Sequence, residues 1–147
     1  MAEPSPPATP PATPPATPPT TPPTTPPGGE PTLRTLAMPA DTNPSGDIFG
    51  GWLLAQMDLA GGLAAGRAAK GRVATVAVDA MTFHRPVKVG DEVAVWAELI
   101  GIGRTSLRFR ISAWRRHREA ERHERVTEAT FTFVALEENG TPRPVPR

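Results

Sequence analysis

The chain has 147 residues, a formal net charge of +1 and no cysteine. This length allows one domain with an appendage, and a chain without cysteine has no disulfide framework and no thiol nucleophile. The near-neutral charge argues against nucleic acid as the main partner, because phosphate binding requires a concentrated basic surface. None of the three histidines stands at metal-ligand spacing, so we expect no metal site and no bound cofactor.

The sequence shows no targeting or membrane segment. Met1 is followed by a small residue, an acidic residue and prolines, without the basic and apolar regions of a secretory signal. No apolar run approaches the ~20 residues that are needed to span a bilayer. We therefore expect a cytoplasmic protein with no membrane partner.

The N-terminal residues are dominated by proline. Proline pairs recur in three ATPP and two TTPP repeats, which run from Ala8 to Pro27 and precede two glycines. Proline at this density interrupts helices and sheets alike, so residues 1–29 are predicted to be a disordered tail with polyproline II character. A spacer is favoured over a ligand for a proline-binding domain, because such ligands usually carry a flanking Arg or Lys and this tail has none. The folded domain is expected at residues 30–147.

The first elements of this domain are a short strand and a long helix. Residues 32–38 have the composition of a strand, and a polar turn follows them. After the Gly50-Gly51 pair, from Trp52 onward, apolar residues keep helical spacing as far as Ala68. Lys70 followed by Gly71 is a typical helix end, with a cation in the last turn and a glycine beyond it.

One carboxylate stands inside this apolar helical pattern. Asp58 has no cation near it in sequence, and an acid in apolar surroundings costs stability, which makes it a candidate functional residue. The alternative is a helix acid that bonds to a neighbouring backbone group and performs no chemistry. The adjacent Gly61 and Gly62 weaken a helix by about 1 kcal/mol each relative to alanine. Their presence predicts that another backbone approaches the helix closely.

The rest of the chain is predicted to be β-structure. Residues 72–84 are apolar on both alternating faces, which is typical of a central strand that is covered on both sides. Further strands are expected at residues 92–102, 105–116 and 126–136, and the last two alternate apolar and polar residues. The mixed charges of residues 115–125 indicate a solvated loop rather than a nucleic-acid patch. The pattern predicts an α+β domain in which a curved antiparallel sheet wraps one helix, and its unpaired edges predict a dimer.

Three motifs carry a resemblance to a known family. The segments NPSGDIFGGW, QMD and MTFHRPVKVGD closely resemble those of the hotdog-fold acyl-CoA thioesterases, of the bacterial YciA type that is related to cytosolic brain-type acyl-CoA hydrolases. The similarity covers residues 32–147. It implies hydrolysis of coenzyme A thioesters, and dimers that join their sheets edge to edge and assemble into trimers of dimers. It also implies that Asp58 is the catalytic carboxylate and that Asn43 helps to place the thioester or the water. Pro44 and His84 depart from the usual residues, and we expect no catalytic role for either.

Thioester hydrolysis needs a carboxylate, donors for the developing oxyanion, and a groove for the substrate. The N–H groups of Gly50 and Gly51 are candidate donors, because the amides of a first helical turn are unpaired. Gly51 and Asp58 are seven positions apart, or roughly 10 Å along one helix, which is too far for one carbonyl to contact both. We therefore expect a shared site, with Asn43 and the helix start of one subunit beside Asp58 of another.

The phosphates of coenzyme A need cationic or N–H contacts. The candidates are Arg85 and the turn formed by Gly103, Arg104, Thr105 and Ser106. The alternatives are that Gly101 and Gly103 mark a bulge or a tight turn and that Arg85 is a surface residue. Two other functions compete with hydrolysis. One is a non-catalytic acyl-CoA-binding hotdog protein; the other is an acyl dehydratase, which needs a histidine paired with the helix acid, and no histidine precedes the helix.

Overall fold

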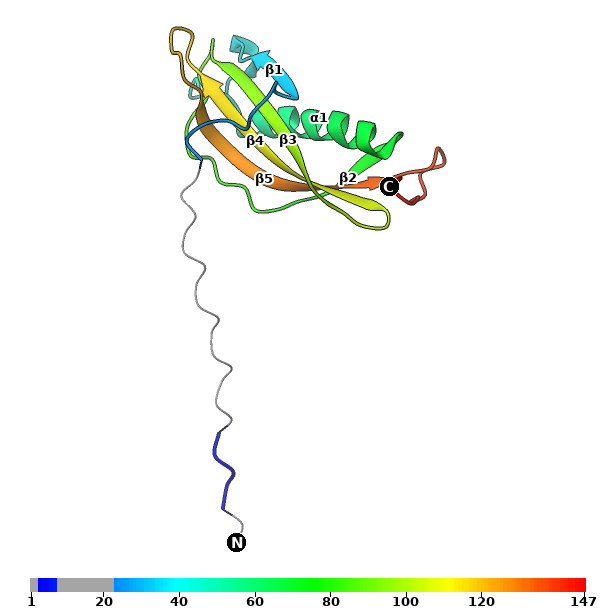
Figure 1. Cartoon of the computed structure of the whole chain (residues 1–147). Helices are drawn as coiled ribbons and strands as arrows, with labels where there is room; N and C mark the ends of the chain where they lie inside the picture. The colour runs from blue at the N-terminus through cyan, green and yellow to red at the C-terminus, as the bar shows by residue number, and fades with distance from the viewer. Residues whose placement is uncertain (1–2, 8–22) are drawn as a thin grey trace.

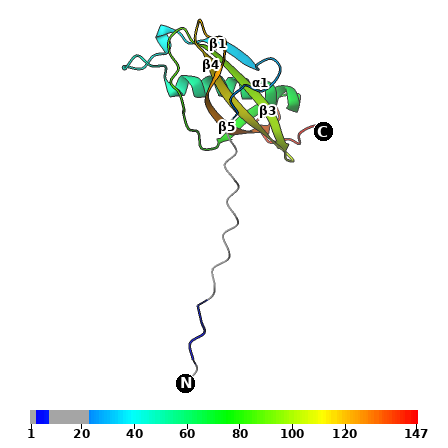
Figure 2. The ribbon, with the colours of Figure 1, turned by 60° about the vertical axis from the view of Figure 1, so that its left-hand side comes forward.

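A curled antiparallel sheet wraps one long helix in this computed structural model, which describes residues 3–7 and 23–147 (Figure 1, Figure 2). The elements are β1 (Leu33–Leu36), the 3-10 turn η1 (Pro39–Asp41), α1 (Gly50–Ala69), β2 (Val73–Val78), β3 (Glu92–Ile102), β4 (Ser106–Arg116) and β5 (Glu124–Ala135). The strands lie in the order β1-β3-β4-β5-β2, and every neighbouring pair is antiparallel. The predicted α+β arrangement is confirmed. The repeats at residues 8–22 of the predicted tail lie outside the described residues.

The main core lies between α1 and the concave face of the sheet. The alternation predicted for the last two strands is confirmed, because their apolar residues are buried while Arg108 and Arg110 on the opposite face are exposed. The buried inner-face residues are Leu107, Phe109, Ile111 and Ala113 on β4 and Ala129, Phe131, Phe133 and Ala135 on β5. Leu53 and Met57 face them from α1. Burial of each large apolar side chain contributes about 1.5–3 kcal/mol, so these two strands hold the helix in place.

The two adjacent glycines of α1 have different surroundings. A Cβ atom on Gly61 would lie 2.5 Å from Cδ1 of Ile111 and 2.6 Å from Cζ of Phe133. A Cβ atom on Gly62 would meet no atom within 4 Å. The predicted close approach is therefore made by the sheet of the same chain at Gly61, whereas Gly62 leaves space beside the helix.

The C-terminal end of α1 differs from the prediction in one respect. Lys70, and not Gly71, adopts the left-handed conformation, with φ 55° and ψ 42°. A Cβ atom on Gly71 would lie 2.7 Å from Nη2 of Arg143, so a larger residue there would displace the end of that side chain. That nitrogen donates to the carbonyl of Ala69 at 2.7 Å, which places a cation at the negative end of the helix.

The prediction of a central strand at residues 72–84 is wrong. β2 spans only Val73–Val78, lies at one edge of the sheet and pairs with β5 alone. Beyond it the chain follows β5 without regular pairing, through bonds from the Asp79 and His84 N–H groups to the carbonyls of Thr130 and Val126. Val76 and Val78 are 57% and 41% exposed. Apolar residues on both faces of this segment therefore do not mean that both faces are buried within the single chain.

Candidate active site

The carboxylate of Asp58 is bound by a hydroxyl from the sheet. Oγ1 of Thr75, on β2, donates a hydrogen bond of 2.6 Å to Oδ1 of Asp58. Both residues line a shallow depression of about 380 Å³, together with Leu59, Leu63 and Gly62. Leu59 and Leu63 are more than half exposed, so the carboxylate lies on the open apolar face of α1 and not in the core. A positioned carboxylate on such a surface can activate water or attack a carbonyl once a substrate or a second subunit covers it.

Asn43 organises the loop that leads into α1. Its Oδ1 accepts hydrogen bonds of 3.0 Å from the N–H groups of both Ser45 and Asp47, and its own N–H donates to the Asp47 carbonyl at 2.6 Å. Asparagine suits this turn because a short amide side chain can satisfy nearby backbone donors. Both hydrogen bonds that the side-chain oxygen accepts therefore come from within the loop. The Nδ2 amide donates no hydrogen bond within the described residues, so it is the group of Asn43 that can serve a substrate.

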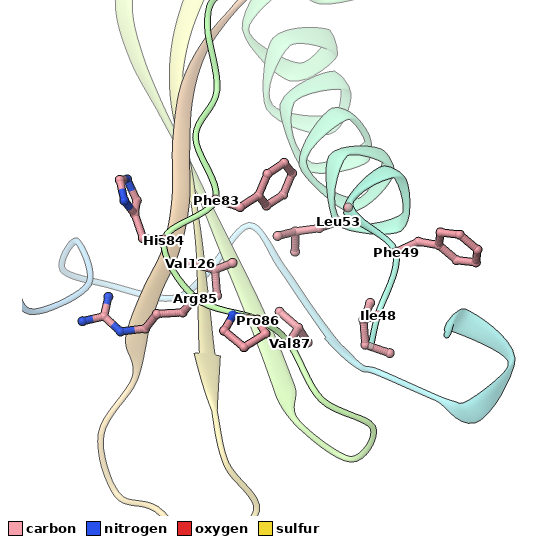
Figure 3. Close-up of a pocket in the computed structure, with 10 residues that line it drawn as sticks. Ile48, Phe49, Leu53, Phe83, His84, Arg85, Pro86, Val87 and Val126 are labelled. Carbon is pink, nitrogen blue, oxygen red and sulfur yellow. The ribbon is translucent and has the colours of Figure 1, made fainter. Parts of the chain in front are cut away.

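The start of α1 lines a separate cavity of about 400 Å³ (Figure 3). Phe49 and Gly50 line it at the start of the helix. Phe83 points toward the helix from the segment after β2, whereas the ring of Phe49 points away from Phe83 (Figure 3). Phe49 caps the helix without a side-chain hydrogen bond, and the N–H groups of Gly50 and Gly51 have no partner among the described residues. These amides can therefore bind an anionic oxygen at the positive end of the helix dipole.

The residues predicted to bind coenzyme A lie at opposite ends of the sheet. Arg85 lines the cavity, but its guanidinium pairs with Glu124 at 3.0 Å and bonds to the carbonyl of Arg125 at 2.8 Å, and it turns away from α1 (Figure 3). The turn of residues 103–106 joins β3 to β4 beside the far end of β5, where the Thr105 carbonyl accepts the Ala135 N–H. The length of β5 separates the two groups by roughly 30 Å.

Several of the predicted residues also have structural roles in this chain. The Gly103 N–H donates to the Ser106 carbonyl at 2.8 Å and closes a tight turn, while the strand register shifts at Gly101. The Arg104 carbonyl accepts the Val145 N–H at 2.9 Å, and the Arg104 side chain is exposed. These observations match the alternatives of a bulge and a tight turn, while a role in coenzyme A binding stays a prediction.

One chain does not bring the predicted catalytic groups together. Gly50 lines the cavity at the helix start, whereas Asp58 lines the depression beside β2, two turns further along α1. The contact that the sequence did not indicate is the one between Thr75 and Asp58, which are 17 residues apart. No local spacing signals it, because it depends on how β2 lies across the helix.

No group of three or more His, Cys, Asp or Glu side chains is placed to hold a metal ion within the described residues. In the same part of the chain, no helix has the length and apolar character to cross a membrane.

Comparison with known proteins identifies close relatives. Residues 45–121 match the family model described as the thioesterase superfamily. The acyl-CoA thioester hydrolase YciA of Salmonella typhimurium is 50% identical over 121 residues, which cover 80% of this chain and 91% of the relative. The solved hexameric thioesterase of Yersinia pestis has a TM-score of 0.78 and 51% identity, and the match covers 82% of this chain and 98% of that chain.

A solved hexameric hotdog fold thioesterase of Campylobacter jejuni matches with a TM-score of 0.75 and 36% identity, over 80% of this chain and 91% of that chain. These matches confirm the hotdog fold that the motifs implied, with its helix inside a curved antiparallel sheet. The chain therefore belongs to the thioesterase superfamily.

Proposed function

We propose that this protein hydrolyses acyl-CoA thioesters to the free acid and coenzyme A. The observation that carries the proposal is the carboxylate of Asp58, which the Thr75 hydroxyl holds on the open face of α1 in a chain of the thioesterase superfamily. The name of the Salmonella relative supports the same substrate class at 50% identity. The catalytic domain is proposed to span residues 30–147, and the cytoplasmic location stays a prediction.

The proposed reaction uses groups of the protein and water. The Asp58 carboxylate either takes a proton from the water that attacks the thioester carbonyl carbon or attacks that carbon itself. The hydrogen bond from Thr75 fixes the direction in which the carboxylate points. The Gly50 and Gly51 N–H groups donate to the oxygen that becomes negative. The C–S bond then breaks, the sulfur takes a proton and leaves as the thiol of coenzyme A, and water supplies the second oxygen of the acid.

Two subunits are proposed to form each site. A carbonyl bound at the Gly50 and Gly51 amides lies roughly 10 Å along the helix from Asp58 of the same chain. The open space at Gly62 and the exposed leucines beside Asp58 suit an antiparallel helix of a second subunit, which would bring its Asn43 and helix start to this carboxylate. The unpaired, apolar edge of β2 suits the joining of two sheets, and we propose that such dimers assemble into a hexamer.

A subunit-exchange experiment tests the shared site. Asp58→Ala removes the carboxylate, and Asn43→Asp removes the Nδ2 donor while an oxygen remains to accept from Ser45 and Asp47. After exchange at equal amounts, half of the dimers are hybrids and each hybrid has one complete site, so about a quarter of wild-type activity should return. A mixture that stays inactive after confirmed exchange would disprove the shared site.

The proposed activity itself is tested by thiol release from acyl-CoA esters of increasing chain length, from acetyl to palmitoyl. Asp58→Asn should keep the fold and lose most turnover, because the amide cannot act as a base or as an anionic nucleophile. Binding of the esters by the wild-type protein without thiol release would favour the non-catalytic acyl-CoA-binding alternative.

A further inference from the structure

A second, smaller apolar cluster lies on the outer face of the sheet, away from α1. It consists of Ala94 and Trp96 on β3 and Trp114 on β4. The strand register places Ala94 opposite Trp114 and Trp96 opposite Ser112, so the two indoles are diagonal neighbours. The outer face of a sheet normally meets solvent, yet Trp114 is 0% exposed and Trp96 only 7% exposed. Another part of the chain must therefore cover these two rings.

The end of the proline-rich segment lies over them, and the ring of His123 packs edge-on against Trp96 at a centroid distance of 6.0 Å. Pro26 and Pro27 are partly buried, and they line one depression with Trp114 and another with Trp96. The indole Nε1 of Trp96 donates to the Gly29 carbonyl at 3.3 Å. In Figure 1 this segment crosses the outer side of β4 and β3 on its way to β1. The covering segment is the fifth repeat, Thr24 to Pro27, with its two glycines.

We propose that the outer face of the sheet is a binding surface for polyproline segments and that the last repeat of this chain is its ligand in cis. Flat aromatic grooves suit polyproline II segments, because the preformed helix loses little entropy on binding and its proline rings stack on the aromatic rings. The Trp96 indole supplies the donor to a backbone carbonyl that such a groove needs.

The charges around the groove explain why a tail without Lys or Arg fits it. Glu128 is paired within the sheet by Arg110 at 3.5 Å and by Arg125 at 3.1 Å. The other carboxylate that lines the depression with Trp114 is Glu98. It lies opposite Arg110 in the strand register, so neither carboxylate requires a cation from the ligand. A neutral repeat of threonine and proline is therefore the complementary ligand.

Fluorine NMR of the full-length protein labelled with 5-fluorotryptophan tests this proposal. The chain has three tryptophans, so each resonance can be assigned by replacing one tryptophan at a time with phenylalanine. In the wild type, the Trp96 and Trp114 resonances should hardly shift between H2O and D2O. In Pro26→Ser/Pro27→Ser both should show a severalfold larger solvent shift. The matched control, Pro10→Ser/Pro11→Ser, changes the same pair in the first repeat and should behave as the wild type does.

The peptide TTPPTTPPGG, which copies residues 20–29, then tests recognition in trans. At about 1 mM, the order of local concentration that a short tether provides, it should restore shielding in Pro26→Ser/Pro27→Ser and leave the wild type unchanged. Docking of the last repeat would be overturned if the wild type and Pro26→Ser/Pro27→Ser showed equal solvent shifts. It would also be overturned if Pro10→Ser/Pro11→Ser increased the shifts as much as Pro26→Ser/Pro27→Ser does. Exposed rings that the peptide does not shield would overturn polyproline recognition.

Discussion

The hydrogen bond from Thr75 to Asp58 gives the sharpest test of the proposed chemistry. Thr75→Val keeps the size and branching of the side chain and removes only the hydroxyl that donates at 2.6 Å. A hydrogen bond to a charged group contributes about 1.5–3 kcal/mol, and the lower value applies because both residues are exposed in the single chain. A loss of ~1.5 kcal/mol in the transition state lowers kcat about tenfold.

The assay is thiol release at saturating acyl-CoA, with the melting temperature measured in parallel. Thr75→Val should lower kcat with little change in KM, because the hydroxyl positions the carboxylate and does not bind the substrate. Thr75→Ser retains the donor and should stay within about twofold of the wild type. In an Asp58→Asn background the valine should cause no further loss, since it can act only through the carboxylate. A wild-type kcat in Thr75→Val, or an additive loss in the double variant, would refute the positioning role.

Four further predictions concern the fold and the self-association of the subunits. Gly61→Ala should lower the free energy of unfolding by about 1–3 kcal/mol, because the added Cβ atom would lie 2.5 Å from a buried side chain. Gly62→Ala should instead leave the folded subunit intact and weaken self-association, which size-exclusion chromatography would measure. Lys70→Gly should raise the melting temperature by a few degrees, since φ 55° costs a non-glycine residue about 1–2 kcal/mol, and an unchanged value would contradict this. The hydrogen bond from Arg116 holds the pKa of Glu92 below its ordinary value of 4.5, so the ionised form stabilises the fold above that pH. Glu92→Gln should therefore melt lower than the wild type at pH 7, and the difference should shrink as the pH falls below 4.5 and through the lowered pKa of the folded state. A difference that is the same at pH 7 and at pH 3.5 would contradict the last prediction.

The local patterns of this sequence determined most of the fold. Alternation along residues 106–116 and 124–135 correctly indicated which side chains enter the core, because the side-chain period of a strand is fixed by its backbone. The apolar helical spacing indicated α1, and three motifs were sufficient to place the chain in its family. These features depend on residues that are close in sequence, so they can be recognised without a structure.

Other features depend on how separate segments meet, and only the tertiary structure decided them. The apolar residues of β2 looked like a central strand, but β2 lies at one edge of the sheet, because a local pattern does not record which strands pair on either side. Asp58 and Thr75 are brought together by the path of β2 across α1. The last proline repeat lines hollows with Trp96 and Trp114 because it crosses the outer face before β1 begins. Contacts of this kind are set by packing between distant segments, whose register and direction no sequence spacing records.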